Sequence, residues 1–200
     1  MSTHPVETPA GPVSYCALFC EENVWWLLDA AHKHAGVACS AALVVSNAHA
    51  QTALMAQRAS ARDDGLVLWD YHVLAAVCVA GEWQAWDPDS CCPMACPWET
   101  YARASFGALR ALEWLDPVFS PRVRVIEGGR YLREFSSDRS HMRDASGAWQ
   151  SPPPSWPALL GPERVLSLAA LRGDESPVVG PWRAPDDVPR ALAALREPGR

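Results

Sequence analysis

The stretch LVLWDYHVLAAVCVAGEWQAWD, residues 66–87, decides the fold. It is rich in β-branched and aromatic residues, which favour strands, and Ala80 and Gly81 interrupt it as a turn would. The pattern predicts a long strand over residues 66–79 and a returning strand from residue 82, joined by a two-residue turn. This hairpin is the frame on which the polar residues of the stretch are placed.

The turn also fixes the register of the two strands. A two-residue turn places Asp87 opposite Leu74 and Asp89 opposite His72. Side chains two apart along a strand point to the same face, so His72 and both aspartates would share one face. The spacing does not choose between Asp87 and Asp89 as the partner of the imidazole.

Upstream of the hairpin, residues 20–32 have the pattern of a helix. Apolar residues recur at positions 24, 27, 28 and 31, and Gly36 is a natural stop. Glu21 and Glu22 fall in the first turn, where acidic side chains complement the helix dipole. Cys20 is therefore expected at the helix N-terminus.

Other segments complete a mixed fold of the α/β (α+β) class. A length of 200 residues suits one domain, 1–200, in which residues 1–13 are expected to form a flexible start. The remaining predictions are a strand at 41–46, a short helix at 52–59, a strand at 122–126, a helical turn at 131–135, an extended proline run at 152–154 and a closing helix at 188–195.

Composition narrows the function classes. The net charge is −6 and no basic face stands out, which argues against a nucleic-acid partner or an anionic membrane surface. Neither a membrane-spanning stretch nor a secretory signal is recognisable, so we expect a cytoplasmic protein. Seven cysteines is an odd number, and in that compartment they are expected to be reduced thiols.

One combination of residues points to chemistry. A helix N-terminus and a nearby imidazole stabilise a thiolate, and a carboxylate fixes the imidazole tautomer. Cys20, His72 and one of the two aspartates fit these roles. Each residue alone is more often structural: a buried thiol, a packed histidine or a turn aspartate. Only their joint arrangement favours a nucleophilic cysteine.

Rival motifs fit less well. Cys16 lies four residues before Cys20 but precedes the helical pattern, and His141 is a second candidate base in a polar segment. The cysteines at 91, 92 and 96 do not have the paired spacing of a zinc site, so neither a metal nor a cofactor is expected.

Longer motifs resemble a known family. The strings Cys-Glu-Glu-Asn-Val-Trp at 20–25, Trp-Asp-Tyr-His-Val at 69–73, Asp-Pro-Asp at 87–89 and Ser-Asp-Arg-Ser-His-Met at 137–142 occur in order. Together with Trp149 and the proline run, they resemble the protein N-terminal glutamine amidohydrolase family. The likeness covers residues 15–156 and fades over 161–200, which we treat as a divergent C-terminal part.

The resemblance implies a fold and an activity. The fold would be a monomeric three-layer α-β-α sandwich resembling the papain and transglutaminase cysteine-protease core, with the triad Cys20, His72 and Asp87. The activity would be deamidation of a protein's N-terminal glutamine to glutamate, with release of ammonia and a role in an N-degron pathway. The partners would be proteins or peptides with a free N-terminal glutamine.

Substrate recognition is expected to use four further residues. An acidic group must meet the free α-ammonium, and Glu22 and Asp138 are the candidates. Tyr71 and Asp89, next to the triad, are expected to border the substrate groove. Two alternatives stay open: a non-catalytic module that binds peptide N-termini, and a cysteine protease or transglutaminase-like acyltransferase on the same fold.

Overall fold

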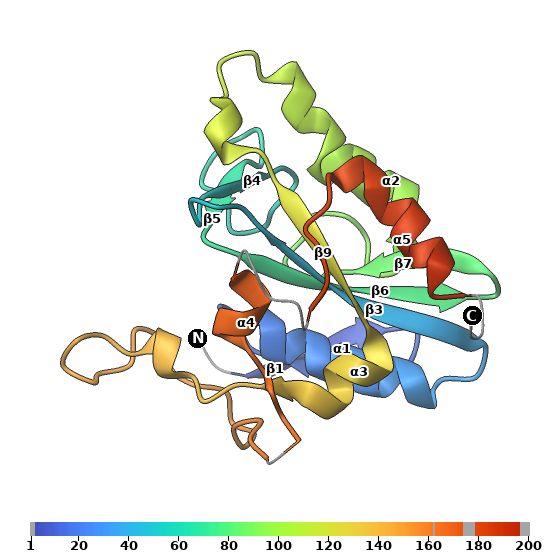
Figure 1. Cartoon of the computed structure of the whole chain (residues 1–200), viewed down its shortest axis with the longest axis vertical. Helices are drawn as coiled ribbons and strands as arrows, with labels where there is room; N and C mark the ends of the chain where they lie inside the picture. Colours follow the sequence, from blue (N-terminus) through green and yellow to red (C-terminus); the bar gives the residue numbers. More distant parts are fainter. Residues whose placement is uncertain (1–2, 162, 174–178, 197–200) are drawn as a thin grey trace.

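The computed structural model describes residues 3–161, 163–173 and 179–196 of the chain (Figure 1). Its strands are β1 (His4–Thr8), β2 (Gly11–Tyr15), β3 (Val37–Ser46), β4 (Thr52–Leu54), β5 (Val67–Trp69), β6 (His72–Val79), β7 (Glu82–Trp86), β8 (Cys96–Pro97), β9 (Arg122–Glu127), β10 (Phe135–Ser136) and β11 (Leu166–Ser167). Its α-helices are α1 (Cys20–Lys33), α2 (Trp98–Ser105), α3 (Gly128–Glu134), α4 (Leu168–Arg172) and α5 (Val188–Ala194).

The core is an antiparallel sheet of five strands in the order β8-β7-β6-β3-β9. Helices α1 and α3 cover one face, and α2 and α5 cover the other (Figure 1). The layering follows from strand alternation: Val73, Ala75 and Val77 of β6 pack under α1, whereas Leu74 and Ala76 face α2 and α5. The mixed fold is as the sequence pattern predicts, and its three layers are as the family resemblance implies.

The predicted hairpin is confirmed. Val79 pairs with Glu82 across the turn, and the ladder runs to Ala75 opposite Trp86. Ala80 and Gly81 have φ of +49° and +86°, the left-handed backbone that a tight hairpin turn of this hand requires. The predicted helix at residue 20, the strand at 122 and the closing helix at 188 are also present.

Two predictions around the hairpin are wrong. The stretch 66–79 is not one strand, because residues 70–71 separate β5 from β6, and β5 pairs with β4 instead of the central sheet. The segment 52–59 begins as strand β4 and not as a helix. Residues 52–54 are fully buried, so their backbone N–H and C=O groups need hydrogen-bond partners, and β5 supplies them. A short stretch of sequence does not reveal that distant partner.

The N-terminal segment is also corrected. The sequence predicts a flexible segment over residues 1–13, but residues 4–15 form the β1–β2 hairpin, whose Val13 and Tyr15 are buried. Within the described part of the chain, no helix is both long and apolar enough to cross a membrane.

The C-terminal part closes the fold. Val188 and Leu192 of α5 are fully buried against the sheet. On β9, the buried Arg124 donates to the carbonyls of Leu171 and Gly173 at 2.6 and 3.0 Å and so fixes the end of α4. The described parts of the chain after residue 160 therefore contribute to the same core.

Candidate active site

Cys20 and His72 meet at a cavity of about 660 Å³ beside the start of β6. Cys20 begins α1, and His72 begins β6, so one helix start and one strand start converge there. The residues lining the cavity are His4, Tyr15, Ala17, Leu18, Cys20, Arg58, Ala59, Trp69, Asp70, Tyr71, His72, Asp89, His141, Met142, Gln150 and Arg172.

The backbone before α1 turns sharply to present the thiol. Leu18 has a φ of +70°, a conformation that costs a non-glycine residue about 1–2 kcal/mol, and it is half exposed at the cavity. Cys20 follows as the first helical residue, and the first N–H groups of a helix lack intrahelical partners. The N–H groups of Phe19 and Glu22 donate to the carbonyls of Cys16 and Phe19, so the Cys20 N–H is the donor best placed for an oxyanion formed at the thiol.

The Cys20 thiol is held neutral in the free protein. Its pKa is raised well above the ordinary value, first by burial and then by the carboxylates of Glu21 and Asp89, while a backbone hydrogen bond with Val73 opposes the shift. A nucleophile of this kind becomes reactive when a base removes its proton during the attack.

The imidazole of His72 is positioned by Asp87. Its Nε2 lies 3.0 Å from Asp87 Oδ2, both side chains are buried, and the Trp69 ring stacks on the imidazole. Tyr101 of α2 donates to the same carboxylate oxygen at 2.8 Å. With Nε2 engaged, Nδ1 is the nitrogen left for a proton exchange with a thiol.

The pKa values of this pair move in opposite directions. Burial alone would lower the pKa of His72, but the charge and hydrogen bond of Asp87 outweigh it and raise the pKa. Burial alone would raise the pKa of Asp87, but His72 and Tyr101 lower it. Asp87 therefore stabilises the imidazolium that forms when His72 takes a proton from a thiol.

Asp89 is close to the triad but has another partner. The ladder ends before it, and the chain turns there because the Asp87 carboxylate accepts the Asp89 N–H at 3.0 Å. Its carboxylate accepts a short hydrogen bond from Tyr15. Burial and the charge of Asp87 raise its pKa, although His72 opposes this. The structure thus gives Asp87, and not Asp89, the contact with the imidazole.

The cluster of His72, Asp87 and Asp89 is also a candidate metal site. Within the described ranges, His72, Asp87 and Asp89 offer donor atoms that all lie within 4.8 Å of one another. However, His72 and Asp87 use these atoms on each other, and tyrosines donate to both carboxylates. The group fits a hydrogen-bonded triad better than a metal centre.

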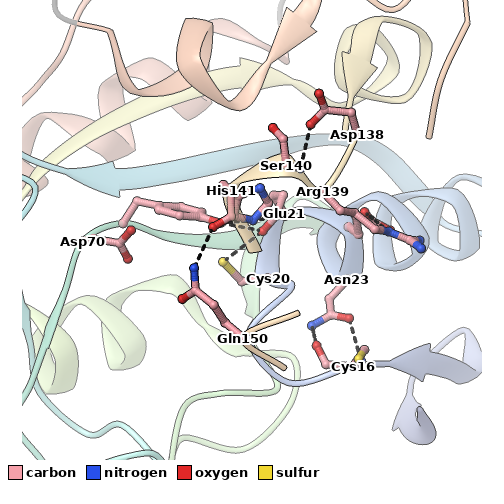
Figure 2. Close-up of polar contacts among 12 residues, drawn as sticks. Cys16, Cys20, Glu21, Asn23, Asp70, Asp138, Arg139, Ser140, His141 and Gln150 are labelled. Atoms are coloured by element: carbon pink, nitrogen blue, oxygen red, sulfur yellow. Dashed lines mark hydrogen bonds and ion pairs between the residues drawn. The ribbon is translucent and has the colours of Figure 1, made fainter. Parts of the chain in front are cut away.

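A second buried cluster lies beside the thiol (Figure 2). The fully buried Glu21 carboxylate accepts from Tyr71 at 3.0 Å, and the Cys20 sulfur is 3.7 Å from the same oxygen. Its other oxygen lies 3.3 Å from His141 Nε2, outside good hydrogen-bond geometry. Burial would lower the pKa of His141, but Glu21 raises it. The sequence pattern predicts only a helix-dipole role for Glu21, because its contacts with Tyr71 and His141 are long-range.

The Glu21 charge should oppose ionisation of the thiol. In Glu21→Gln, the hydrogen bond from Tyr71 can persist while the charge is lost, so the pKa of Cys20 should fall. The pH dependence of iodoacetamide labelling of Cys20, followed by peptide mass spectrometry, should shift to lower pH. Glu99→Gln, an exposed glutamate in the first turn of α2, is the matched control. An unchanged or higher midpoint in Glu21→Gln would contradict this electrostatic role.

Glu22 does not line the cavity. Its carboxylate is fully buried and accepts two hydrogen bonds at 2.8 Å from Arg139 and one at 2.6 Å from Trp156 Nε1. This places Glu22 in a buried ion pair that ties α1 to the segment carrying His141. Asp138 is exposed and lies at a neighbouring cavity, whereas Tyr71 and Asp89 do line the Cys20 cavity.

The ion pair makes a prediction about stability. Arg139→Met leaves the Glu22 charge buried without its cation, which should cost about 3–5 kcal/mol of unfolding free energy. Urea denaturation of Arg139→Met and of the double variant Glu22→Gln, Arg139→Met measures the effect. The double variant should recover part of the loss because no charge is then stranded. A loss below about 1 kcal/mol in the single variant would refute the stabilising role of the pair.

Comparisons with known proteins agree with the motifs. A family model described as N-terminal glutamine amidase matches residues 15–172. Three relatives carry the name protein N-terminal glutamine amidohydrolase. The one from Bos taurus is 37% identical over 167 residues, covering 82% of this chain and 79% of the relative. The one from Danio rerio is 36% identical, and the match covers 84% of this chain and 83% of the relative. The one from Homo sapiens is 35% identical, and the match covers 82% of this chain and 80% of the relative.

Proposed function

The chain belongs to the N-terminal glutamine amidase family, and on that premise we propose that it deamidates N-terminal glutamine by the triad Cys20, His72 and Asp87. Membership makes it an amidohydrolase. The observation that carries the triad is the buried 3.0 Å contact of His72 with Asp87, at a cavity that also exposes the helix-terminal Cys20. The products are N-terminal glutamate and ammonia.

The first half of the reaction is acylation. The Cys20 sulfur attacks the side-chain amide carbon of the glutamine while its proton passes to His72 Nδ1. The resulting oxyanion is met by the backbone N–H of Cys20 at the start of α1. His72 returns the proton to the amide nitrogen, the C–N bond breaks, and ammonia leaves a thioester on Cys20.

The second half is hydrolysis. Water gives a proton to His72 as its oxygen attacks the thioester carbon. The C–S bond then breaks, the sulfur regains a proton from His72, and glutamate is released. Asp87 stabilises the imidazolium in both halves without itself taking the proton.

Substrate binding uses the walls of the same cavity. We assign Tyr71 and Asp89 to this role, because both line it beside Cys20. Glu22 is a weaker candidate for the α-ammonium, since Arg139 already neutralises it. Asp70 and Asp89 are the acidic residues of the lining, and Arg172 pairs with Asp70, so we assign the cationic terminus to Asp89.

The biological setting follows from the product. A glutamate at a protein's N-terminus is a destabilising end in an N-degron pathway, and we propose that this enzyme supplies it. We place the reaction in the cytoplasm, where a catalytic thiol stays reduced. The enzyme would act as a monomer on proteins and peptides, with no nucleic-acid or membrane partner.

The test compares three peptides that differ only at their first residue: Gln, Asn and N-acetyl-Gln. We expect ammonia from the Gln peptide alone, with a small mass increase and an intact backbone. Equal release from all three, or none, would refute the proposal. Cleavage of the backbone would instead indicate a protease, and binding without ammonia a non-catalytic module.

A further inference from the structure

A second cavity adjoins the one at Cys20. It has a volume of about 820 Å³, and His141 and Arg172 line both cavities, so these two side chains form the partition. In Figure 2, Asp138 and Ser140 lie on one side of His141 and Cys20 on the other. The two cavities are therefore neighbours that share one wall.

Hydroxyl groups dominate the polar lining of the second cavity. Five serines contribute to it, at positions 46, 136, 137, 140 and 167, together with Asn47. Ser136 and Ser167 are paired across the parallel strands β10 and β11, which fixes their positions. A hydroxyl both donates and accepts, so such a wall matches the alternating N–H and C=O groups of a peptide backbone.

Ser137 points independently to a ligand. It is 3% exposed, and its hydroxyl oxygen has no hydrogen-bond partner among the residues that the structure describes. Its backbone N–H is already used, donating to the Leu159 carbonyl at 2.9 Å. A buried hydroxyl without a partner is costly, and a rotation of the Ser137 side chain toward the cavity would bring it to a bound group.

We propose that this serine-lined cavity binds the backbone of the second to fourth residues of the substrate chain. The inference rests on the proposed function: when the glutamine side chain reaches Cys20, the rest of the polypeptide must leave the first cavity. The second cavity shares His141 and Arg172 with the first, so it is the adjoining space for that part of the chain. Three extended residues span about 10 Å, and the cavity volume lies within the usual range for a ligand site.

The proposal predicts weak selection of the second residue. Serine hydroxyls bind peptide groups that every sequence contains. The partition adds the cation of Arg172, whose Cζ lies 5.0 Å from the Tyr71 ring centroid and whose Nη1 lies 3.5 Å from Asp70 Oδ2. Affinity should therefore depend on substrate length more than on the identity of residue two.

The experiment uses the full-length enzyme and two probes, the dipeptide Gln-Gly and the hexapeptide Gln-Gly-Ala-Ala-Ala-Ala, with ammonia release as the readout. Ser137→Ala removes the unpaired hydroxyl, which should not harm folding. Ala169→Trp fills the cavity from α4, and Ala193→Trp, an exposed alanine on α5, is the matched control. Thermal unfolding verifies that each variant is folded.

For the hexapeptide, Ser137→Ala should raise KM about three- to tenfold and Ala169→Trp should raise it further, with kcat little changed. In Ser137→Ala and Ala169→Trp, KM for the dipeptide should stay within about twofold of the native value. In Ala193→Trp, KM for both peptides should stay within the same limit. If KM rises equally for both peptides in these variants, or does not change for the hexapeptide, the inference is overturned. Ammonia release by the native enzyme would still support the proposed function. No ammonia from the native enzyme would overturn both.

Discussion

Replacing Cys20 with alanine is expected to reduce ammonia release from a Gln-initiated peptide by at least about 10⁴-fold. The sulfur forms the covalent intermediate, and no other group at the cavity can replace it once it is gone. Because Cys20 is small and Ala is a good helix former, the unfolding midpoint should change by only a few degrees. Steady-state kinetics and thermal unfolding on the same preparation measure both quantities.

Cys16→Ala is the matched control for this prediction. Cys16 is a second buried thiol four residues earlier, held in a loop that Asn23 fixes by hydrogen bonds to its backbone N–H and carbonyl, each 2.8 Å long (Figure 2). It does not line the Cys20 cavity, so its loss should leave kcat within about threefold. Full activity in Cys20→Ala combined with inactivity in Cys16→Ala would transfer the nucleophile to Cys16.

Asp87→Asn is expected to lower kcat by about 10³–10⁴-fold. The amide cannot stabilise the imidazolium, and it can donate to His72 Nε2, which would leave the wrong tautomer facing the thiol. Asp89→Asn is the comparison: it keeps the contact of His72 with Asp87, so its effect should be at least about tenfold smaller. A larger loss in Asp89→Asn than in Asp87→Asn would reverse the assignment.

The Asp87 variant should also change the pH dependence of stability. In the native protein the raised pKa of His72 contributes stability that is present below about pH 6.5 and lost as pH rises through the folded-state value. The lowered pKa of Asp87 contributes stability that is present above about pH 4 and lost as pH falls. The stability difference between native and Asp87→Asn, from urea titrations, should be widest between about pH 4 and 6.5. A difference that grows above pH 7 would contradict this linkage.

Features set by local pattern were predictable from the sequence. The helix at Cys20 follows from its apolar period and acidic first turn, and the hairpin follows from two adjacent small residues between strands. The hairpin register correctly brought His72 near an aspartate but could not choose which one. That choice depends on the turn after Trp86, where the Asp87 carboxylate accepts a hydrogen bond from the Asp89 N–H. The Asp89 carboxylate instead accepts a hydrogen bond from Tyr15.

Features set by distant partners were not predictable. Strand β5 leaves the central sheet because β4, thirteen residues earlier at its nearest point, offers a buried pairing edge. The sequence pattern predicts the same helix-dipole role for Glu21 and Glu22. In the structure, Glu21 faces His141 and Glu22 binds Arg139, and each partner lies more than a hundred residues further along the chain. Long-range contacts of this kind leave no periodic trace in the sequence.

The central claim is a thioester between Cys20 and the substrate's glutamine side chain. Rapid acid quenching of the native enzyme with a saturating Gln-initiated peptide, followed by digestion and mass spectrometry, detects it directly. We expect an adduct on the peptide that contains Cys20, equal in mass to the substrate minus ammonia, and no adduct in Cys20→Ala. Ammonia release accompanied by an adduct on another residue, or undiminished release from Cys20→Ala, would contradict the account.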